Sequence, residues 1–310
     1  MLRLRNKKTA AGKQDAARSG YKGLCIGIEI GGSFIKYAAV REYMERYRLA
    51  ACGMREISGD GEAAAGCLRE ILRPYADEYA VIQAALPGPD VKTIFFDVSG
   101  RGRGAVRKND FLEWRFHKIY GGREKLECRA QQIAEKNGMV RVMAAAAERR
   151  LTDSVKNIFI KAGAAPAVID SGVNFCFNAF YEDINRSPGA LIVIEQEYRG
   201  LIIWDENRTP FYINSWRSRH PGENTEKNIL EAAADAERII RNCVSEPDMP
   251  APEKIYFCGS DFAADAGKEI LNRRIEGGVI NLRITDRIEP EAGVNTRDIG
   301  AAVLCAAVKR

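Results

Sequence analysis

The chain has 310 residues, of which 46% are apolar, and its formal net charge is +5. This length predicts two domains with separate cores. The first 22 residues carry seven basic side chains and one acidic one, 7 − 1 = +6, so the rest of the chain sums to 5 − 6 = −1. The positive charge belongs to an N-terminal tail, and it gives no support for a protein body that binds nucleic acid.

Residues 1–22 are poor in aromatic residues and predict a disordered basic tail. Two alternatives remain open for its charge, a solvated leader or a weak attraction to an anionic membrane surface. No apolar segment follows it as in a secretory signal, and no uncharged apolar run reaches the roughly 18 to 20 residues of a membrane span. The eight cysteines lie at least 15 residues apart, as reduced thiols do, and two histidines offer little for a metal site. We therefore expect a cytoplasmic protein without a metal centre.

The first ordered part of the chain predicts a three-stranded meander, a helix and two neighbouring strands. Their residues are 24–30, 34–40, 47–53, 62–75, 80–88 and 91–98. A loop rich in glycine and arginine follows and predicts a linker. Beyond it we expect a small α+β subdomain, inserted at about residues 99–148, with a helix at 111–120 and strands at 125–136 and 139–145. A helix at 149–162 and a strand at 167–170 lead back to the first domain.

The opening pattern recurs about 165 residues later. Three strands lie within residues 190–215, a long helix at 225–244, and a strand at 254–257 that ends in a glycine turn. The chain closes with a helix of small residues at 300–308. An internal repeat of this kind predicts two duplicated domains. We place them at residues 23–170 and 171–292, with residues 293–310 returning to the first domain.

Several motifs occur in an order that resembles one known family. These are GIEIGGSFIKYAAV, AALPGPDVKTIFFDV, FLEWRF, the segment from VMAAAAERRL to APAVID, KIYFCGSDFAADAGKEI and RDIGAAVLCAAV. Together they span about residues 23–308. They resemble the actin, sugar-kinase and Hsp70 ATPase superfamily and, within it, the PilM family of type IV pilus assembly proteins. The resemblance implies an α/β, actin-like fold of duplicated domains with an inserted α+β subdomain, in which two glycine turns grip nucleotide phosphates across a cleft.

By this resemblance, Gly31, Gly32, Ser33 and Lys36 form the first phosphate loop. Two glycines allow backbone N–H groups to approach a phosphate, the serine adds a hydroxyl donor, and the lysine adds positive charge. The alternative is a tight hairpin that holds no ligand. Glu29 stands where the family has aspartate, and its extra methylene puts the position of a metal ion in question.

The second turn departs from the family pattern, and we expect it to be shorter than the first. Glu195 is expected in the place of the second aspartate, but Glu197 stands where a glycine should approach the phosphate, and two carboxylates there would repel it. We expect Arg199 to be solvated. On the adenosine side, the family's glycine pair is replaced by Gly259 and Ser260.

No catalytic base is evident at the expected cleft, and we expect Asp170 to cap a helix at the domain hinge. The cofactor implied by the resemblance is ATP with Mg²⁺, and we predict that it is bound weakly or not at all. We also predict no useful hydrolysis.

The leading hypothesis for function is a cytoplasmic adaptor at the inner membrane. The resemblance implies that it binds the short N-terminal cytoplasmic peptide of a PilN-like single-span membrane protein. We expect the groove for this peptide at residues 84–98 and 111–160, with contacts from Leu86, Pro87, Phe95 and Trp114. The alternatives are a sugar-type kinase on the same fold and the soluble component of a type II secretion L-like assembly. The sequence does not decide which machine the protein serves.

Overall fold

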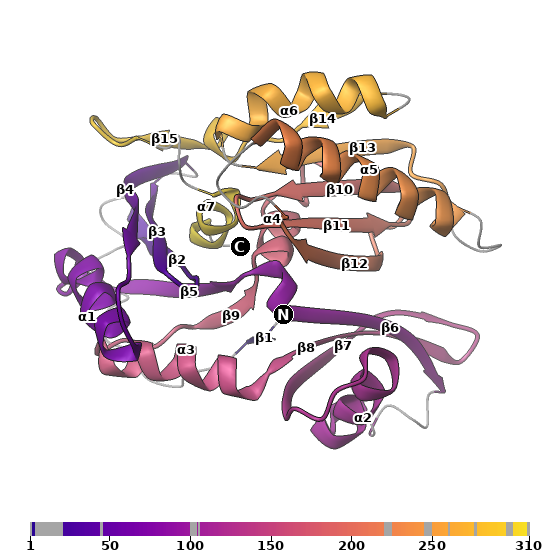
Figure 1. Ribbon diagram of the computed structural model, residues 1–310, viewed down its shortest axis with the longest axis horizontal. Helices are drawn as coiled ribbons and strands as arrows, with labels where there is room; N and C mark the ends of the chain where they lie inside the picture. The colour runs from indigo at the N-terminus through magenta and orange to yellow at the C-terminus, as the bar shows by residue number, and fades with distance from the viewer. Residues whose placement is uncertain are drawn as a thin grey trace.

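The computed structural model describes residues 2–3, 21–43, 46–99, 104, 106–219, 225–244, 250–259, 261–275, 278–295 and 300–308. Most of the basic tail, residues 4–20, and Ser260 lie outside these ranges. The described residues form three β-sheets (Figure 1). Two large sheets lie side by side with helices between and outside them, and a smaller sheet extends from the first.

The first domain contains a seven-stranded sheet. Its strands are β1 (Leu2–Arg3), β2 (Tyr21–Ile30), β3 (Phe34–Tyr43), β4 (Arg46–Glu56), β5 (Ala80–Leu86), β9 (Val168–Ser171) and β15 (Ile288–Pro290), in the order β1-β9-β5-β2-β3-β4-β15. Helices α1 (Gly61–Leu72) and α3 (Arg149–Lys161) cover its outer face. Helix α1 begins after Asp60 because that carboxylate accepts hydrogen bonds from the N–H groups of Glu62 and Ala63. The short helix η2 (Arg73–Tyr75) extends α1.

The second domain repeats this plan with a five-stranded sheet. Its strands are β10 (Gly189–Ile194), β11 (Tyr198–Trp204), β12 (Pro210–Arg217), β13 (Lys254–Gly259) and β14 (Val279–Asn281), in the order β12-β11-β10-β13-β14. Helices α5 (Thr225–Val244) and α6 (Asp261–Arg274) pack on its outer face. The short helix η5 (Ile284–Asp286) follows β14.

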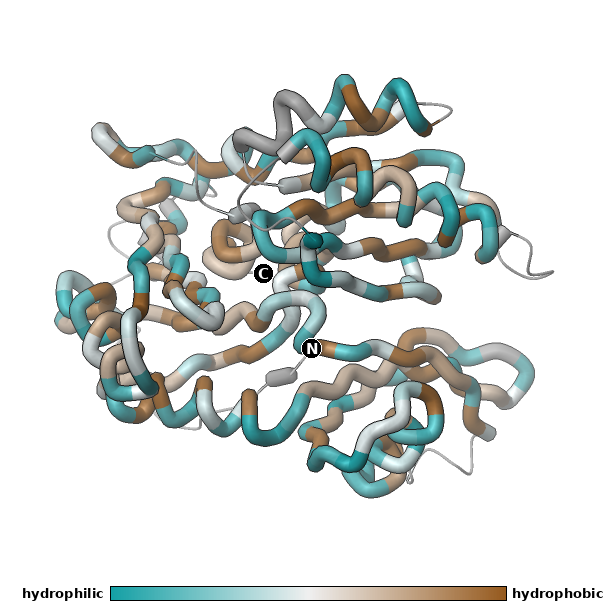
Figure 2. The backbone as a smooth tube through the Cα atoms, viewed as in Figure 1, coloured by the Kyte–Doolittle hydropathy of each residue, from teal (hydrophilic) through white to brown (hydrophobic). Residues whose placement is uncertain are grey.

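Two helices occupy the space between the large sheets. They are α4 (Gly172–Ala179) and α7 (Ala301–Ala307), and Figure 2 shows apolar residues along α7 at the centre of the molecule. Gly27 in β2 permits this packing, because a Cβ atom there would lie 2.2 Å from the carbonyl oxygen of Val303. The C-terminal helix therefore returns to the first domain and closes its core.

The inserted subdomain begins earlier than the sequence suggested. It contains a three-stranded sheet of β6 (Val91–Ser99), β8 (Met139–Glu148) and β7 (Leu126–Lys136), with helix α2 (Asn109–Tyr120) on its outer side. The expected pairing of residues 91–98 with the strand before it is wrong, because β6 pairs with β8 instead. The short helix η3 (Gly88–Asp90) turns the chain from one sheet into the other.

The chain ends also differ in part from expectation. Leu2 and Arg3 pair with β9 as a strand, whereas the whole tail was expected to be disordered. The chain rejoins the first domain at β15, which pairs with β4 inside the range assigned to the second domain. Among the described residues, no helix is long and apolar enough to cross a membrane.

Candidate functional site

The two domains present equivalent hairpin turns to each other. In the first, Ile30 is opposite Ile35, and in the second, Ile194 is opposite Arg199. Each turn is closed by a 2.9 Å backbone hydrogen bond, from Gly31 to Phe34 and from Glu195 to Tyr198. The turns therefore have the same length, and the expectation of a shortened second turn is wrong.

This equivalence changes the role of Glu195. It corresponds to Gly31, a residue of the turn itself, and not to Glu29, which lies two residues earlier in a strand. Likewise Tyr198 corresponds to Phe34, so an aromatic residue follows each turn. The second turn thus carries a long carboxylate side chain where the first has none.

Within the first turn, Gly31 is required by the hairpin's own packing. A Cβ atom on Gly31 would lie 2.4 Å from the ring of Phe34, which covers it. A Cβ atom on Gly32, in contrast, would meet no described atom within 4 Å, and both Gly32 and Ser33 are exposed. The first glycine therefore has a structural explanation without a phosphate.

Glu29 and Lys36 form a buried ion pair at the base of this hairpin. They are direct partners in the β2–β3 register, each is 2% exposed, and Lys36 Nζ lies 3.7 Å from Glu29 Oε1. The same ammonium lies 4.8 Å from the centroid of the Phe34 ring. Burial raises the pKa of Glu29, and the positive charge of Lys36 opposes that rise. The lysine expected to contact phosphate is therefore held by its own strand pair.

Tyr198 links the two domains at this point. Its side chain is 1% exposed, and its hydroxyl donates a 3.3 Å hydrogen bond to Glu29 Oε2 across the domain boundary. A Cβ atom on Gly172, at the start of α4, would lie 2.1 Å from the same hydroxyl oxygen. Tyr198 was not predicted as a site residue, although its position directly after the second turn, like that of Phe34 after the first, was the signal.

Glu195 holds the N-terminus of α7. Its Oε1 accepts a 2.8 Å hydrogen bond from the N–H of Ala302, while Oε2 is buried and has no hydrogen-bond partner among the described residues. A Cβ atom on Gly300 would lie 2.1 Å from Oε2, so α7 approaches this carboxyl closely. Burial raises the pKa of Glu195 to about 8, which keeps the group largely protonated at neutral pH. A protonated carboxyl packed against a helix is not positioned to coordinate Mg²⁺.

Arg199 is buried, and the expectation that it is solvated is wrong. Only 3% of its side chain is exposed, and its guanidinium lies 2.7 Å from Glu231 and 3.5 Å from Asp235, both on α5. Two carboxylates balance the charge of the arginine on the outer face of the five-stranded sheet. Arg199 therefore does not face the other turn and cannot neutralise a phosphate there.

The remaining predicted residues of the cleft lie at strand ends. Gly259 is the last residue of β13 and is paired with Ile194. Asp170 is 2% exposed, and its Oδ1 accepts hydrogen bonds of 2.8 Å from Ser171 N and from Asn174 Nδ2. The N-cap of α4 is Ser171 and not Asp170, since the serine side chain accepts from Asn174 N. Asp170 orients the first turn of that helix instead.

Thiols do not add a metal site to this cluster. All eight cysteines are free, and five of them are buried. Hydrogen bonds from Cys258 and Cys305 lower the pKa of buried Cys176 to about 5. Nevertheless, no group of three histidine, cysteine, aspartate or glutamate side chains in the described part of the chain has the arrangement that a metal ion requires.

A groove opens beside the inserted subdomain. It has a volume of about 490 Å³ and lies among η3, β6, α2, β8 and the start of α3, with Arg217 of the second domain at its rim. Its apolar lining includes Phe116, Leu126 and Leu151. We call this cavity the insert groove. Its size falls within the range of ligand-binding clefts.

Charged residues line the rim of the insert groove. Arg217 lies 2.6 Å from Asp90 and so joins the two domains there. Arg150 lies 2.6 Å from Glu148, and Lys92 is exposed on β6. Burial raises the pKa of Asp90, and the positive charge of the nearby Arg217 opposes that rise. The groove therefore combines an apolar floor with charges of both signs.

The four residues predicted to contact a partner lie elsewhere. Leu86 and Pro87 are buried, and Phe95 is partly buried against the core between the two large sheets. Trp114 is 55% exposed, but it does not line the groove. The predicted residue ranges thus contain most of the groove lining, while the particular side chains named from the sequence do not contribute to it.

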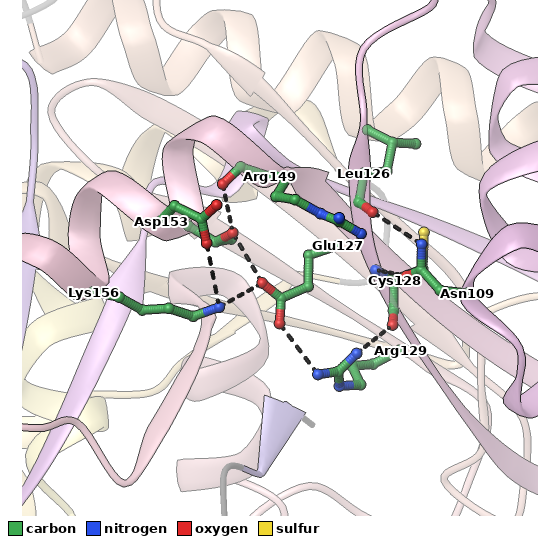
Figure 3. Close-up of polar contacts among 9 residues, drawn as sticks. Asn109, Leu126, Glu127, Cys128, Arg129, Arg149, Asp153 and Lys156 are labelled. Carbon is green, nitrogen blue, oxygen red and sulfur yellow. Dashed lines mark hydrogen bonds and ion pairs between the residues drawn. The ribbon is translucent and has the colours of Figure 1, made fainter.

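A polar cluster fixes the inserted sheet to the first domain. Figure 3 shows Glu127 of β7 between Lys156 and Arg129, at 2.6 Å and 3.2 Å. The hydroxyl of Thr152 donates to the same carboxylate at 3.0 Å. Burial raises the pKa of Glu127, but the hydrogen bonds from Lys156 and Thr152 hold it below its usual value. Strand β7 is thereby fastened to α3, and the two walls of the insert groove keep a fixed spacing.

No protein-family model matches this sequence, and no curated protein matches it significantly. Several solved structures, however, match the fold of this chain. The PilM–PilN type IV pilus biogenesis complex contains a chain that superposes with a TM-score of 0.68 at 16% identity, and the match covers 91% of this chain and 97% of that one. A Bacteroides thetaiotaomicron protein with an actin-like ATPase fold and unknown function superposes with a TM-score of 0.50 at 10% identity, over 87% and 94% of the two chains.

This chain has the actin-like ATPase fold. The fold class expected from the motifs is confirmed, and the resemblance to PilM is confirmed at the level of the fold. Because the identities are low, the chemistry of this chain has to be argued from its own residues.

Proposed function

We propose that this protein is an adaptor of an assembly complex at a membrane and binds an extended peptide of a membrane partner in the insert groove. The observation that carries the proposal is the contrast between two sites of the same fold. Beside the paired turns, the charged and polar side chains of Lys36, Glu195 and Tyr198 are engaged in contacts within the protein, while the insert groove is open. The partner of the structurally similar PilM in its complex, PilN, gives the class of partner.

The groove suits an extended peptide with apolar and charged side chains. Phe116 and Leu151 offer an apolar floor, and Lys92 and Arg150 offer charge at the rim. An extended segment would place alternate side chains toward this floor and toward the rim. Leu126 of β7 and Leu151 of α3 belong to two elements that the Glu127 cluster holds together, so this part of the groove is formed in advance of binding.

We further propose that ATP with Mg²⁺ binds weakly or not at all and that the protein is not an ATPase. Two of the residues expected at the nucleotide are engaged elsewhere, Lys36 with Glu29 and Glu195 with α7, and Arg199 is held by α5. A nucleotide would have to break these contacts and expose buried charges, which is costly.

A pull-down with an immobilised peptide tests the adaptor function. The peptide is the N-terminal cytoplasmic segment of a single-span membrane protein encoded beside this chain. The wild type should be retained, and Leu151→Asp should reduce retention at least tenfold because it places a carboxylate on the apolar floor. Ile160→Asp, on the same helix but 67% exposed and outside the groove, is the matched control and should bind like the wild type. Equal retention of both variants would refute the assignment of the groove.

A further inference from the structure

Helix α2 has two sides with different chemistry. Leu112 and Phe116 face the core of the inserted subdomain and are 2% and 1% exposed. At about 100° per residue, Trp114 lies on the opposite side of the helix, and it is 55% exposed. Figure 1 shows α2 on the outer side of the small sheet, at the edge of the molecule. With Ile119, which is 57% exposed, Trp114 gives this surface helix two large exposed apolar side chains.

Two cationic and three apolar residues lie on the side of α2 that runs from Trp114 toward one flank of the helix. On the helical wheel they occupy an arc of about 140° that begins at Trp114. They are Phe111, Trp114, Arg115, Lys118 and Ile119, and we call them the outer face of α2. Of the two acidic residues of α2, Glu113 lies on the other flank, and Asp110 lies about 40° from Trp114. Exposed tryptophan and isoleucine interleaved with lysine and arginine are typical of helices that lie in the interface of a membrane.

The cations and rings of the outer face are packed together. Lys118 Nζ lies 5.4 Å from the centroid of the Trp114 ring, and the Arg115 guanidinium lies 5.8 Å from that of Phe111. The rings of Phe111 and Trp114 are 6.3 Å apart. Ile119, which is 57% exposed, continues the face toward the end of the helix. The apolar groups are therefore held in place before any partner arrives.

The surrounding segment is strongly basic. Residues 101–125 contain eight lysine and arginine residues and three acidic ones, 8 − 3 = +5, which equals the net charge of the whole chain. Such a segment is attracted to an anionic surface, and each basic residue near lipid headgroups contributes about 1 kcal/mol. A lipid surface also rewards the burial of Trp114 and Ile119, whereas the phosphate backbone of a nucleic acid offers nothing to an isoleucine.

We propose that the outer face of α2 docks this protein on an anionic lipid bilayer. Trp114 and Ile119 enter the headgroup layer, and Lys118 contacts lipid phosphates, while Arg115 stays over the Phe96 ring of β6, at 4.0 Å from its centroid. The opposite flank of the same helix, with His117 and Tyr120, lines the insert groove. A peptide that emerges from the bilayer would thus reach the groove directly. Vesicle docking needs no peptide, so it can be tested separately from the proposed adaptor function.

Co-sedimentation of the full chain with vesicles tests the docking. Vesicles of phosphatidylethanolamine and phosphatidylglycerol should pellet the wild type, and vesicles of phosphatidylcholine alone should not. Trp114→Ala combined with Ile119→Ala should weaken binding about tenfold, and Lys118→Ala about fivefold. Ile160→Ala removes an apolar group from α3 that is 67% exposed, more than Ile119, and should bind like the wild type. Unchanged binding of the α2 variants, or equal binding to both vesicle types, would overturn the proposal.

Tryptophan fluorescence gives a second, local readout. Trp204 is fully buried and Trp216 is partly buried, so quenching by brominated lipid in the headgroup-proximal part of the bilayer should come from Trp114. Trp114→Phe should abolish the quenching and retain most of the sedimentation, since phenylalanine keeps an apolar ring. Quenching that persists in Trp114→Phe would place another surface on the lipid and refute the assignment.

Discussion

Replacing Glu195 with glutamine tests whether the buried carboxyl group that holds the N-terminus of α7 lowers the stability of the folded protein at neutral pH. Burial raises the pKa of Glu195 from 4.5 to about 8. Between pH 4.5 and about pH 8, Glu195 is ionised in the unfolded chain and protonated in the folded protein. The contribution of Glu195 to the free energy of unfolding is therefore highest below pH 4.5 and falls as the pH rises toward 8. Since one pKa unit corresponds to about 1.4 kcal/mol, the loss reaches about 3 kcal/mol at pH 7.

Glu195→Gln removes this loss and keeps the shape of the side chain. Its Oε1 can still accept from Ala302 N, so α7 retains its contact. We expect the variant to be about 3 kcal/mol more stable than the wild type at pH 7 and within about 1 kcal/mol of it at pH 5. Urea unfolding followed by circular dichroism from pH 5 to pH 8 measures both values. Glu206→Gln, in the exposed turn after β11, is the control and should show no pH-dependent difference. A stability difference that stays constant across this range would refute the reasoning.

Three further predictions concern stability. Gly31→Ala should lower the free energy of unfolding by about 1 to 3 kcal/mol, because its Cβ atom would meet the buried Phe34 ring. Gly32→Ala should leave the thermal denaturation unchanged, and equal losses in the two variants would contradict the packing argument. Glu29→Gln should destabilise the fold by about 3 kcal/mol by leaving a buried ammonium unpaired, and adding Lys36→Met should restore most of this; no rescue in the double variant would count against the pair. Glu127→Gln should cost about 1 to 2 kcal/mol at pH 7. Because the folded pKa of this group is lowered, its contribution is lost on acidification, so the two unfolding curves should converge below pH 4.5.

The sequence predicted the repeat and the order of the strands well, because each hairpin combines an apolar run with a tight turn. It did not predict which sheet β6 joins. The segment is apolar and follows β5 closely, which favours a neighbour in the same sheet, yet Pro87 and the short helix η3 turn the chain away. The partner of a strand depends on contacts distant in sequence, and local periodicity contains no information on them.

The site was predicted only in part, for a related reason. Charged residues are expected at the surface, so Arg199 was assigned to solvent, although α5 supplies two carboxylates from about 30 residues away. The pairing of Glu29 with Lys36 could have been found, because counting outward from the turn makes them opposite each other in the hairpin. Tyr198 could have been found by aligning the two turns.

Isothermal titration of the partner's N-terminal peptide tests the central claim, that the insert groove and not the nucleotide cleft is the working site of this protein. The peptide is injected into the full chain with and without Mg-ATP. We predict saturable binding that Leu151→Asp abolishes, that Ile160→Asp preserves and that Mg-ATP does not alter. No binding of the peptide, together with micromolar binding of Mg-ATP, would contradict the account.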